Sequence, residues 1–455
     1  MVYNVMKLFY SELIFLFPFH LMFRRCRIDM KIIFMVIDGV ADTLRYRPTS
    51  LELARKIGLD QLARKSIAGC FYPIDNETPP ESDAAVFSLL GYDPRRINIG
   101  RGLLEALGVG IKIKEGYEVV FRANFATIDP SNKKIIDRRV GRSLSSEEAQ
   151  ELAKAIDGID LGIYNGYARV IASIGHRAVV VIGSKEKRLS ADVSNTDPAY
   201  AKEGRLSVAL KSFKPFIEPC KALNNSEEAR ITCELVDEFT RKIIDILDKH
   251  PLNIERATKG LPKANALLLR DAEDRYPSIE PIRNLYNRTF GIVAEMPVEK
   301  GIGVILGMDI AQVPPPTNNP QIDYEERLKA SLDLLKKNDV VYVHLKGPDE
   351  PGHDGDKERK IKSIELIDSY FIQPLINNID LDNVAIIITS DHATPPELKA
   401  HSSDPVPIIV AYNGLNRFDD LKSFTEYECC NKGSLGLIAN GFKVLKEIFT
   451  ILEQK

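Results

Sequence analysis

Acidic residues and histidines follow three apolar, strand-like runs of this chain, close to the point where each run ends. The runs span 32–37, 340–343 and 384–388, so they lie far apart in the sequence. The carboxyl ends of parallel strands meet at one edge of a sheet, where ligands gather. The side chains that follow these runs are Asp38, Asp349, His353, Asp391, His392 and, shortly afterwards, His401. This pattern predicts a metal site at one edge of a parallel sheet.

Strand-like runs alternate with helix-like segments at both ends of the chain, which predicts an α/β fold with a parallel sheet flanked by helices. From about Gly108 onward, short strand-like pieces alternate with polar loops, which is typical of an α+β insertion. We therefore expect one domain built from 30–110 and 285–455, and an inserted substrate-binding domain at 111–284.

The composition is that of a globular protein. The 455 residues are 44% hydrophobic and carry a formal net charge of −3, which provides no general field for nucleic acid. The six cysteines form no C-x-x-C pair, so we expect reduced thiols in a cytoplasmic protein.

The apolar stretch 8–23 admits three interpretations. A membrane span is disfavoured because the stretch is short and contains Glu12, Pro18 and His20. A signal peptide is disfavoured because the basic residues follow the apolar run and no small-residue cleavage site is present. We favour a functional chain that starts at Met30, with 1–29 as a leader, and expect no membrane association.

Seven side chains have the chemistry to hold two divalent ions. Asp349, His353 and His401 form one candidate group. Asp38, Asp391 and His392 form the other, together with the hydroxyl of Ser82, which we place at a helix N-terminus. Mixed oxygen and nitrogen donors favour manganese, zinc or cobalt, with magnesium less suited. Two ions about 4 Å apart can clamp the attacking and leaving oxygens of a phosphoryl displacement.

Each motif also has a structural explanation when it is taken alone. Asp38-Gly39 is compatible with a simple turn, and Asp391-His392 with a hydrogen-bonded loop pair. His344 has no acidic neighbour in sequence, so we interpret it as a core residue or as one that contacts a metal ligand. The coincidence of several such motifs after strands favours the metal site.

Several motifs, in their order along the chain, resemble the archaeal-type cofactor-independent phosphoglycerate mutases of the alkaline phosphatase superfamily. The most specific are Leu-Leu-Gly-Tyr-Asp-Pro at 89–94 and the segment from His401 to Pro407. The others lie at 37–39, 81–83, 100–102, 346–355 and 391–395. The resemblance runs from about Met30 to the C-terminus and implies an alkaline-phosphatase-like metal domain interrupted by a substrate-binding insertion.

The resemblance also implies roles for individual residues. Ser82 would be the nucleophile that becomes phosphoserine, and the two candidate groups would hold the two ions. Lys346 would neutralise the transferring phosphoryl group, and Asp137 or His176 would move a proton. No bisphosphoglycerate is needed, and the partner is a small phosphoglycerate. The substrate-binding residues would be Arg101, Arg138, Arg139, Arg142, His176 and Arg177. Without the resemblance, the arginines at 138–142 are compatible with a solvated, salt-bridged loop.

The chain departs from the family pattern at Ala84, at Asn195 and at 271–273, none of which is a predicted metal ligand. Two alternatives therefore stay open beside the mutase. One is a phosphatase, or a phosphotransferase that acts on a small hydroxy acid such as homoserine. The other is a non-catalytic, metal-binding relative. The sequence does not indicate the metal or the oligomeric state.

Overall fold

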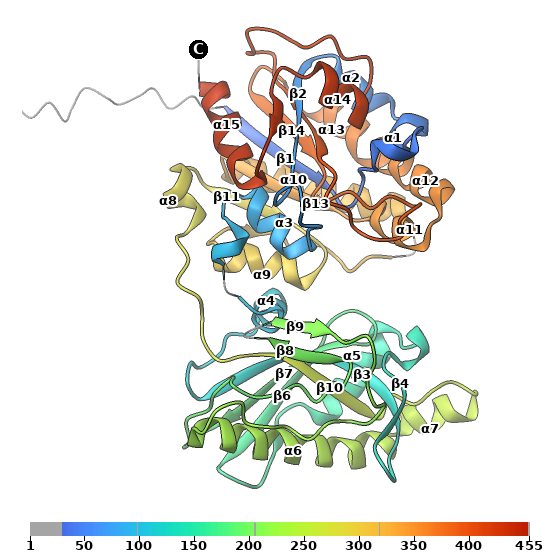
Figure 1. Ribbon diagram of the computed structural model, residues 1–455, viewed down its shortest axis with the longest axis vertical. Coiled ribbons are helices and arrows are strands. Elements are labelled where there is room, and N and C mark those ends of the chain that lie inside the picture. Colours follow the sequence, from blue (N-terminus) through green and yellow to red (C-terminus); the bar gives the residue numbers. More distant parts are fainter. Residues whose placement is uncertain (1–29, 98, 204–205, 318, 454–455) are drawn as a thin grey trace, which may run out of the picture.

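The computed structural model describes residues 30–97, 99–203, 206–317 and 319–453, which form two lobes (Figure 1). The predicted leader at 1–29 lies outside the described residues. No helix in these described ranges has both the length and the apolar character needed to cross a membrane.

The first lobe, called the large-sheet lobe, is built on an eight-stranded sheet. Its strands come from both ends of the chain. In spatial order they are β12 (Asp309–Ile310), β11 (Phe290–Val293), β13 (Val340–Leu345), β1 (Lys31–Ile37), β14 (Val384–Thr389), β15 (Val406–Ala411), β2 (Ser66–Phe71) and β16 (Gly436–Ile438). Neighbouring strands are parallel except at β15, which is antiparallel to both β14 and β2. The α/β class is confirmed, with one reversed strand in the sheet.

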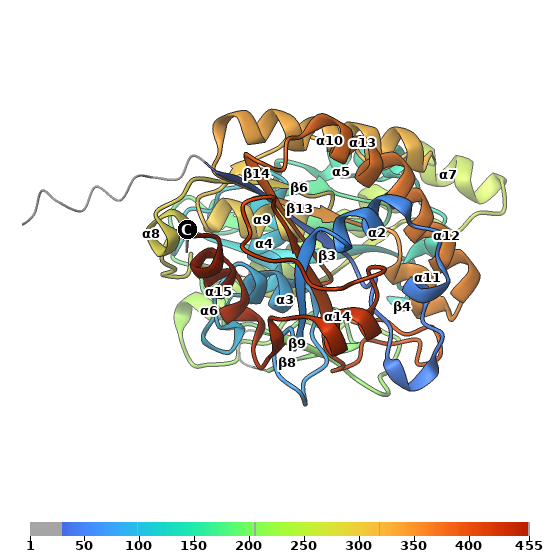
Figure 2. The ribbon, with the colours of Figure 1, turned by 90° about the horizontal axis from the view of Figure 1, so that it is seen from above.

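Both faces of the large sheet are covered by helices because both faces are apolar. In β1, Ile32, Phe34 and Val36 join one hydrophobic cluster, whereas the alternate residues join another. Figure 2 shows helices α10 and α13 on one side of the sheet and α3 and α15 on the other. The helices of this lobe are α1 (Ser50–Leu53), α2 (Ile57–Ala63), α3 (Ser82–Leu89), α8 (Ile282–Tyr286), α9 (Pro297–Ile305), α10 (Pro320–Lys337), α11 (Asp349–Asp354), α12 (Lys357–Ile367), α13 (Gln373–Asn378), α14 (Glu426–Lys432) and α15 (Gly441–Glu453).

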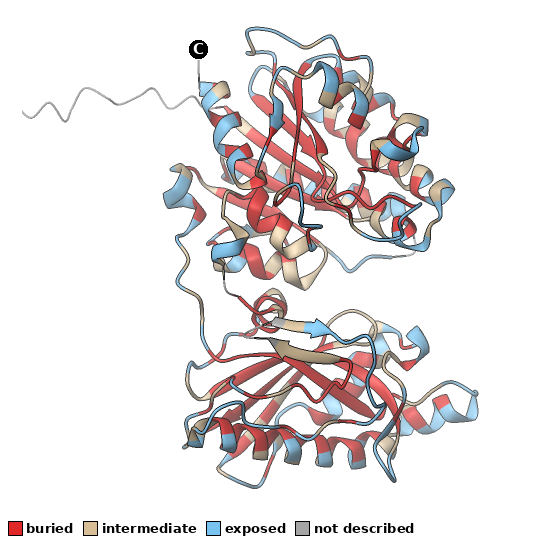
Figure 3. Cartoon of the chain, viewed as in Figure 1, coloured by how far each residue is buried: buried red, intermediate tan, exposed pale blue. Residues whose placement is uncertain are grey.

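The second lobe, called the small-sheet lobe, is built on a six-stranded antiparallel sheet. Its strands are β10 (Ala266–Glu273), β3 (Glu118–Asp129), β7 (Arg177–Ser184), β6 (Gly166–Ala172) and β5 (Ile159–Asp160), with β4 (Lys134–Asp137) paired to β3. Helices α5 (Ser146–Ile156) and α6 (Glu227–Asp248) bury their apolar faces on one side of it. Helix α7 (Pro251–Thr258) follows α6, and β8 (Tyr200–Glu203) pairs with β9 (Leu206–Ala209). Figure 3 shows buried strands in both lobes and an exposed outer side of α6.

Helix α4 (Arg101–Gly108) lies between the lobes (Figure 1). It packs on β3 of the small sheet and on α9 of the large-sheet lobe. A Cβ at Gly108 would lie 1.8 Å from the carbonyl oxygen of Pro297, so only glycine permits this approach. Val120 and Val179 of the small sheet belong to the same hydrophobic cluster as Leu104 of α4. The two lobes therefore share apolar packing through α4.

The expectation of six reduced cysteines is wrong for four of them. Cys70 is bonded to Cys430 and Cys220 to Cys233, while Cys429 is a buried free thiol. The first pair is separated by 360 residues in sequence, yet its Cα atoms lie 5.1 Å apart. A search for closely spaced cysteines cannot detect such a pair, because the fold alone brings the two residues together.

Candidate active site

Three adjacent parallel strands of the large sheet position the predicted metal ligands. Strands β13, β1 and β14 are neighbours, and Asp38, Asp349 and Asp391 follow their carboxyl ends. At Gly39 a Cβ would lie 2.7 Å from the Thr394 hydroxyl oxygen and 2.8 Å from an Asp349 carboxylate oxygen. The small residue therefore lets the loops after these strands converge. The structure brings all seven predicted ligands to this edge.

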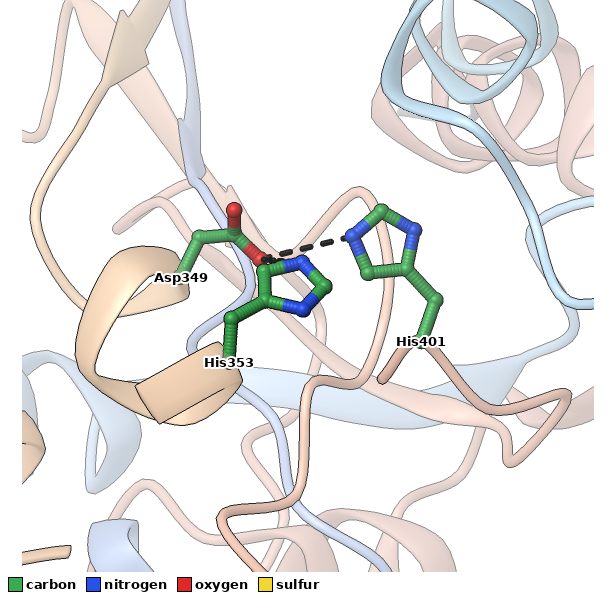
Figure 4. Close-up of side chains that lie close together, drawn as sticks. All are labelled: Asp349, His353 and His401. Atoms are coloured by element: carbon green, nitrogen blue, oxygen red, sulfur yellow. Dashed lines mark ion pairs between the residues drawn. The ribbon is translucent and has the colours of Figure 1, made fainter. Parts of the chain in front are cut away.

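The first candidate group consists of Asp349, His353 and His401 (Figure 4). The Nε2 atoms of His353 and His401 lie 3.5 Å and 3.4 Å from Oδ1 of Asp349. The Nδ1 atoms face backbone carbonyls, which only accept, at 3.2 Å for His353 and 2.6 Å for His401. Each Nδ1 therefore carries the hydrogen, and each Nε2 lone pair is left for an ion.

The second candidate group surrounds His392, whose side chain is fully buried. Its Nε2 lies 3.2 Å from Oδ1 of Asp38, 3.3 Å from Oδ2 of Asp391 and 3.2 Å from the Ser82 hydroxyl. The Thr394 hydroxyl donates to Asp349 at 2.8 Å, so it accepts from Nδ1 of His392 at 3.0 Å. The Nε2 lone pair of His392 thus also faces the candidate ion position.

Both carboxylates of the second group keep one oxygen open. Within the described residues, Oδ1 of Asp38 and Oδ2 of Asp391 are buried and have no hydrogen-bond partner. The other oxygen of Asp391 accepts backbone N–H groups of Gly39 and His392, both at 3.0 Å. Buried oxygens without a donor are costly, and a cation relieves that cost. The donor set of both groups therefore fits divalent ions.

The charges in the site support the same conclusion. Burial and the neighbouring charge of Asp38 raise the pKa of Asp391. Burial also opposes ionisation of Asp38, but the ammonium of Lys346 and the nearby imidazoles hold its pKa well below the usual value. Two close, buried carboxylates repel each other when both are charged, so a cation between them stabilises the ionised pair.

Lys346 lies beside this site rather than in solvent. Its ammonium contacts Oδ2 of Asp38 at 2.6 Å and Oε1 of Glu299 at 2.8 Å. Burial disfavours the charged form, but the two carboxylates outweigh burial and hold the pKa of Lys346 well above its usual value. Lys346 is therefore a fixed positive charge next to the candidate metal site.

Ser82 is the first residue of α3, as the sequence predicted. Its neighbours Glu81 and Asp83 are both held by Arg101 of α4. The guanidinium contacts Asp83 at 2.8 Å through two nitrogens and Glu81 at 2.9 Å. Arg101 was predicted to bind substrate, and here its guanidinium positions the segment that carries Ser82.

A cleft of about 630 Å³ opens next to Ser82. Both lobes contribute to its walls. Its charged lining on the side of the small sheet consists of Arg101, Glu105, Arg122 and Arg177, and on the side of the large sheet it includes Asp38, Glu299, Lys346 and Asp349. Of the predicted substrate residues, Arg101 and Arg177 line this cleft.

The loop after β4 lies around a separate hollow. Asp137, Arg138, Arg139 and Arg142 line a cavity of about 360 Å³ with Phe213. The Arg138 guanidinium is paired with the buried carboxylate of Asp197 at 2.6 Å and 3.0 Å. Arg138 is thus bound to a carboxylate, as Arg101 is.

His176 lies within electrostatic reach of Arg139 and Arg142 of this hollow and of Arg177 of the Ser82 cleft. Burial, together with the charges of Arg177, Arg139 and Arg142, lowers the pKa of His176 to about 4. Burial opposes ionisation of Asp137, but the backbone N–H groups of Gly141 and Arg139 lower its pKa below the usual value. At neutral pH the site therefore contains a neutral imidazole and a charged carboxylate.

The sequence interpretation missed Arg122, Arg270 and Glu299. Arg122 and Arg270 lie opposite each other on β3 and β10 and line a second hollow against α4, and Arg122 also lines the Ser82 cleft. Arg122 contacts Glu105 at 2.8 Å, and Glu299 contacts Lys346. The signal was present, because a charged residue inside an otherwise buried apolar strand or helix requires a partner.

Two of the departures from the family pattern have structural explanations. Glu273 accepts the backbone N–H of Gly100 at 2.9 Å, just before α4 begins. Asn195 donates to the carbonyl of Tyr200 at 3.1 Å and to Ser207 at 3.0 Å, which ties it to the β8–β9 hairpin. Nothing in the structure explains the alanine at position 84.

Comparisons with known proteins identify the family of the chain. The family model for 2,3-bisphosphoglycerate-independent phosphoglycerate mutase matches residues 63–253. The enzyme of that name from Aeropyrum pernix is 42% identical over 429 residues, which is 93% of this chain and all of the relative. The one from Archaeoglobus fulgidus is 38% identical over 408 residues, covering 89% of this chain and 94% of the relative.

Two solved structures are similar over most of their length. The cofactor-independent phosphoglycerate mutase from Thermoplasma acidophilum aligns with a TM-score of 0.60 at 30% identity, over 92% of this chain and 99% of that one. The PH0037 protein from Pyrococcus horikoshii aligns with a TM-score of 0.71 at 28% identity, over 94% and 98% of the two chains. This chain therefore belongs to the family of 2,3-bisphosphoglycerate-independent phosphoglycerate mutases.

Proposed function

We propose that the protein interconverts 3-phosphoglycerate and 2-phosphoglycerate through a phosphoserine on Ser82, without bisphosphoglycerate. The observation that carries the proposal is the position of Ser82 at the first turn of α3. Its hydroxyl lies 3.2 Å from Nε2 of His392, at the mouth of a cleft that also contains Lys346 and Arg177. A nucleophile, cationic groups and a small-molecule cleft are the parts that phosphoryl transfer requires.

Two divalent ions would bind at this site. Asp349, His353 and His401 would hold one, and Asp38, Asp391, His392 and Ser82 would hold the other. Mixed carboxylate and imidazole donors support manganese, with zinc, cobalt or magnesium as alternatives. When bound, the ions supply positive charge that lowers the pKa of the Ser82 hydroxyl and stabilises the transferring phosphoryl group.

The residues of the chain would carry out the transfer in two steps. In the first, the Ser82 oxygen attacks phosphorus in line, the bond from phosphorus to the substrate oxygen breaks, and glycerate is left in the cleft. Backbone N–H groups at the start of α3 and the ammonium of Lys346 would provide positive charge for the phosphoryl oxygens. In the second step, the other glycerate hydroxyl attacks phosphorus and the bond to Ser82 breaks.

The small-sheet lobe would hold the glycerate between these steps. The guanidinium groups of Arg177 and Arg122 line the cleft and match the planar carboxylate of glycerate. Arg139 and Arg142 would join them from the neighbouring hollow. Asp137 or His176 would move the proton from the attacking hydroxyl to the oxygen released in the first step.

Glycerate must be kept from leaving, and water must be kept from the phosphoserine. We propose that the inserted segment 111–284 acts as a separate domain that closes on the remainder, 30–110 and 285–455. The open cleft between the lobes supports this division. A cytoplasmic location follows from the phosphoglycerate substrate, although two disulfides are uncommon in that compartment outside hyperthermophiles.

The direct test is to incubate the purified protein with manganese and 3-phosphoglycerate, without bisphosphoglycerate, and to follow the products by ³¹P NMR. We expect 2-phosphoglycerate. Release of free phosphate would instead indicate a phosphatase, and phosphorylation of added homoserine would indicate a phosphotransferase.

The matched control is Ser82→Ala, which should lower turnover by ~10⁴-fold or more while the metal content is retained. Acid-quenched wild-type protein should yield a phosphorylated peptide that contains Ser82. Near-normal turnover of the Ser82→Ala variant would exclude the serine as nucleophile.

A further inference from the structure

A buried histidine outside the predicted ligand set faces the second candidate metal site. His344 lies on β13, in register with Val36 of the neighbouring strand β1. Val36 is two residues before Asp38 in the sequence. Its side chain is buried with 1% of its surface exposed. His344 therefore reaches the site from within the sheet, whereas the predicted ligands reach it from the loops.

The Nε2 atom of His344 points at the two carboxylates of that site. It lies 3.7 Å from Oδ2 of Asp391 and 3.9 Å from Oδ2 of Asp38. Within the described chain, this nitrogen and the Asp391 oxygen it faces are both buried without a hydrogen-bond partner. Both separations exceed the length of an N–H···O hydrogen bond, so the nitrogen is not satisfied by either carboxylate.

The other ring nitrogen holds the imidazole in this orientation. Nδ1 of His344 lies 3.2 Å from the hydroxyl of Tyr342, which is also buried. The Tyr342 ring in turn packs edge-on against Phe34, with ring centroids 5.5 Å apart. A ring fixed in this way by a partner on one nitrogen, with the other nitrogen open, is the usual arrangement of a metal-binding histidine.

The spacing of the donor atoms also suits ligation. Ligand atoms bound at about 2.1 Å to one ion lie roughly 3.0–3.4 Å apart when adjacent and up to about 4.2 Å apart when opposite. Nε2 of His392 and Nε2 of His344 lie 3.3 Å and 3.7 Å from the same oxygen, Oδ2 of Asp391. Both separations fall within the range that one coordination shell allows. At Asp38, His392 lies 3.2 Å from Oδ1, whereas His344 lies 3.9 Å from Oδ2, the oxygen that pairs with Lys346.

We propose that His344 is an additional ligand of the second metal ion, beside Asp38, Asp391 and His392. The inference rests on the proposed function for the presence of that ion, and it adds a histidine to the ligand set. Asp38, His344 and Asp391 form a buried group whose donor atoms lie close enough to hold one ion, and a cation there would provide a partner for Nε2 of His344 and for Oδ2 of Asp391.

The experiment compares metal binding by the purified wild-type chain and two variants, His344→Ala and His344→Gln. Metal-free protein is titrated with manganese by calorimetry, and the bound metal is counted by elemental analysis. We expect the dissociation constant of one of the two ions to rise by ~100-fold or more, above the loss typical of groups that only contact a ligand. Binding of the other ion should change little.

Two controls separate the ligand from a general effect of removing a histidine. His250→Ala removes a histidine that caps α7 in the small-sheet lobe, and it should leave the dissociation constants of both ions unchanged. Asp391→Asn, at a predicted ligand, should weaken the same ion as the His344 variants. Circular dichroism and thermal melting of each variant verify that it is folded.

X-ray absorption of cobalt-loaded protein, with cobalt at both sites, distinguishes ligation from a purely positioning role. The average number of imidazoles per ion should be higher in the wild type than in His344→Gln. Unchanged dissociation constants in both variants would overturn the proposal, and so would an unchanged imidazole count. If the wild type bound two ions but produced no 2-phosphoglycerate, the proposed function would fail and the ligand assignment would stand.

Discussion

Two regions are built in different ways: the strand-end edge of the large sheet, and the arginines of α4 and the small-sheet lobe, called the arginine face, which include Arg101, Arg122, Arg138 and Arg177. At the strand-end edge, ligands from three neighbouring parallel strands converge with open donor atoms. On the arginine face, Arg138 is paired with Asp197, Arg122 with Glu105, and Arg101 with Asp83. The first region is therefore assembled to receive cations, whereas in the second region several guanidinium groups are already held by carboxylates. We therefore expect that separate substitutions can disrupt metal binding and substrate binding independently.

The largest effect is expected at the strand-end edge. Asp391→Asn removes one of the charges that hold the second ion, so turnover should fall by ~10⁴-fold or more and one ion per chain should be lost. Elemental analysis and the ³¹P NMR assay measure the two quantities. A variant that keeps both ions and full turnover would contradict the assignment of this edge.

The two disulfides offer a comparison of stability between the lobes. Cys430→Ser opens a loop of 360 residues that is closed within the large-sheet lobe and includes the small-sheet lobe, and Cys233→Ser opens one of 13 residues within the small-sheet lobe. Loop entropy in the unfolded chain predicts losses of about 6 and about 3 kcal/mol, respectively. Denaturant unfolding of the two variants measures both, and an equal or reversed order would contradict this explanation.

The next effect concerns the arginine face. Arg177→Met removes a guanidinium that lines the cleft, so kcat/KM should fall by ~10²–10³-fold while both ions are retained. Arg138→Met is the matched variant, because its guanidinium is held by Asp197. It should cost about 2 kcal/mol of stability and change kcat/KM less. Equal kinetic losses in the two variants would show that both arginines contact substrate.

The smallest effect is a pH dependence of stability at Glu426, a buried residue outside the predicted metal-ligand set. Burial and the nearby Asp42 raise the pKa of Glu426 from 4.5 to about 7. Its carboxylate accepts the backbone N–H of Asp42 at 2.8 Å and the hydroxyl of Thr49 at 2.7 Å, while Lys360 pairs with Asp42 at 2.7 Å. Because its pKa is raised in spite of these hydrogen bonds, the Glu426 carboxylate binds a proton more tightly in the folded chain than in the unfolded chain.

The stability from this group is fully present below pH 4.5 and is lost as the pH rises through about 7. The loss amounts to at most about 3 kcal/mol. Glu426→Gln should remove it, so the variant should gain stability relative to the wild type between pH 4.5 and pH 8. Urea unfolding at several pH values measures this, and parallel pH profiles would contradict the assignment.

Much of the strand-end edge could be predicted from the sequence. Ile32 to Ile37 reads as a buried strand, and Asp38 must follow its end. The same argument places Asp349 and Asp391, because parallel strands carry their ends to one edge. Local pattern was also sufficient to place Ser82 at the start of a helix. In each case the information lies within a few residues of the side chain concerned.

The tertiary structure decided which distant groups meet. No local pattern distinguishes Arg138, which pairs with Asp197, from Arg177, which lines the cleft. The sequence pattern likewise does not show that β15 runs antiparallel to its neighbours or that Cys70 is bonded to Cys430. It also does not show that the imidazole of His344 faces Asp391. The physical reason is that hydrophobic period and turn chemistry act over a few residues. Partner choice among buried charges depends instead on how whole strands and lobes pack.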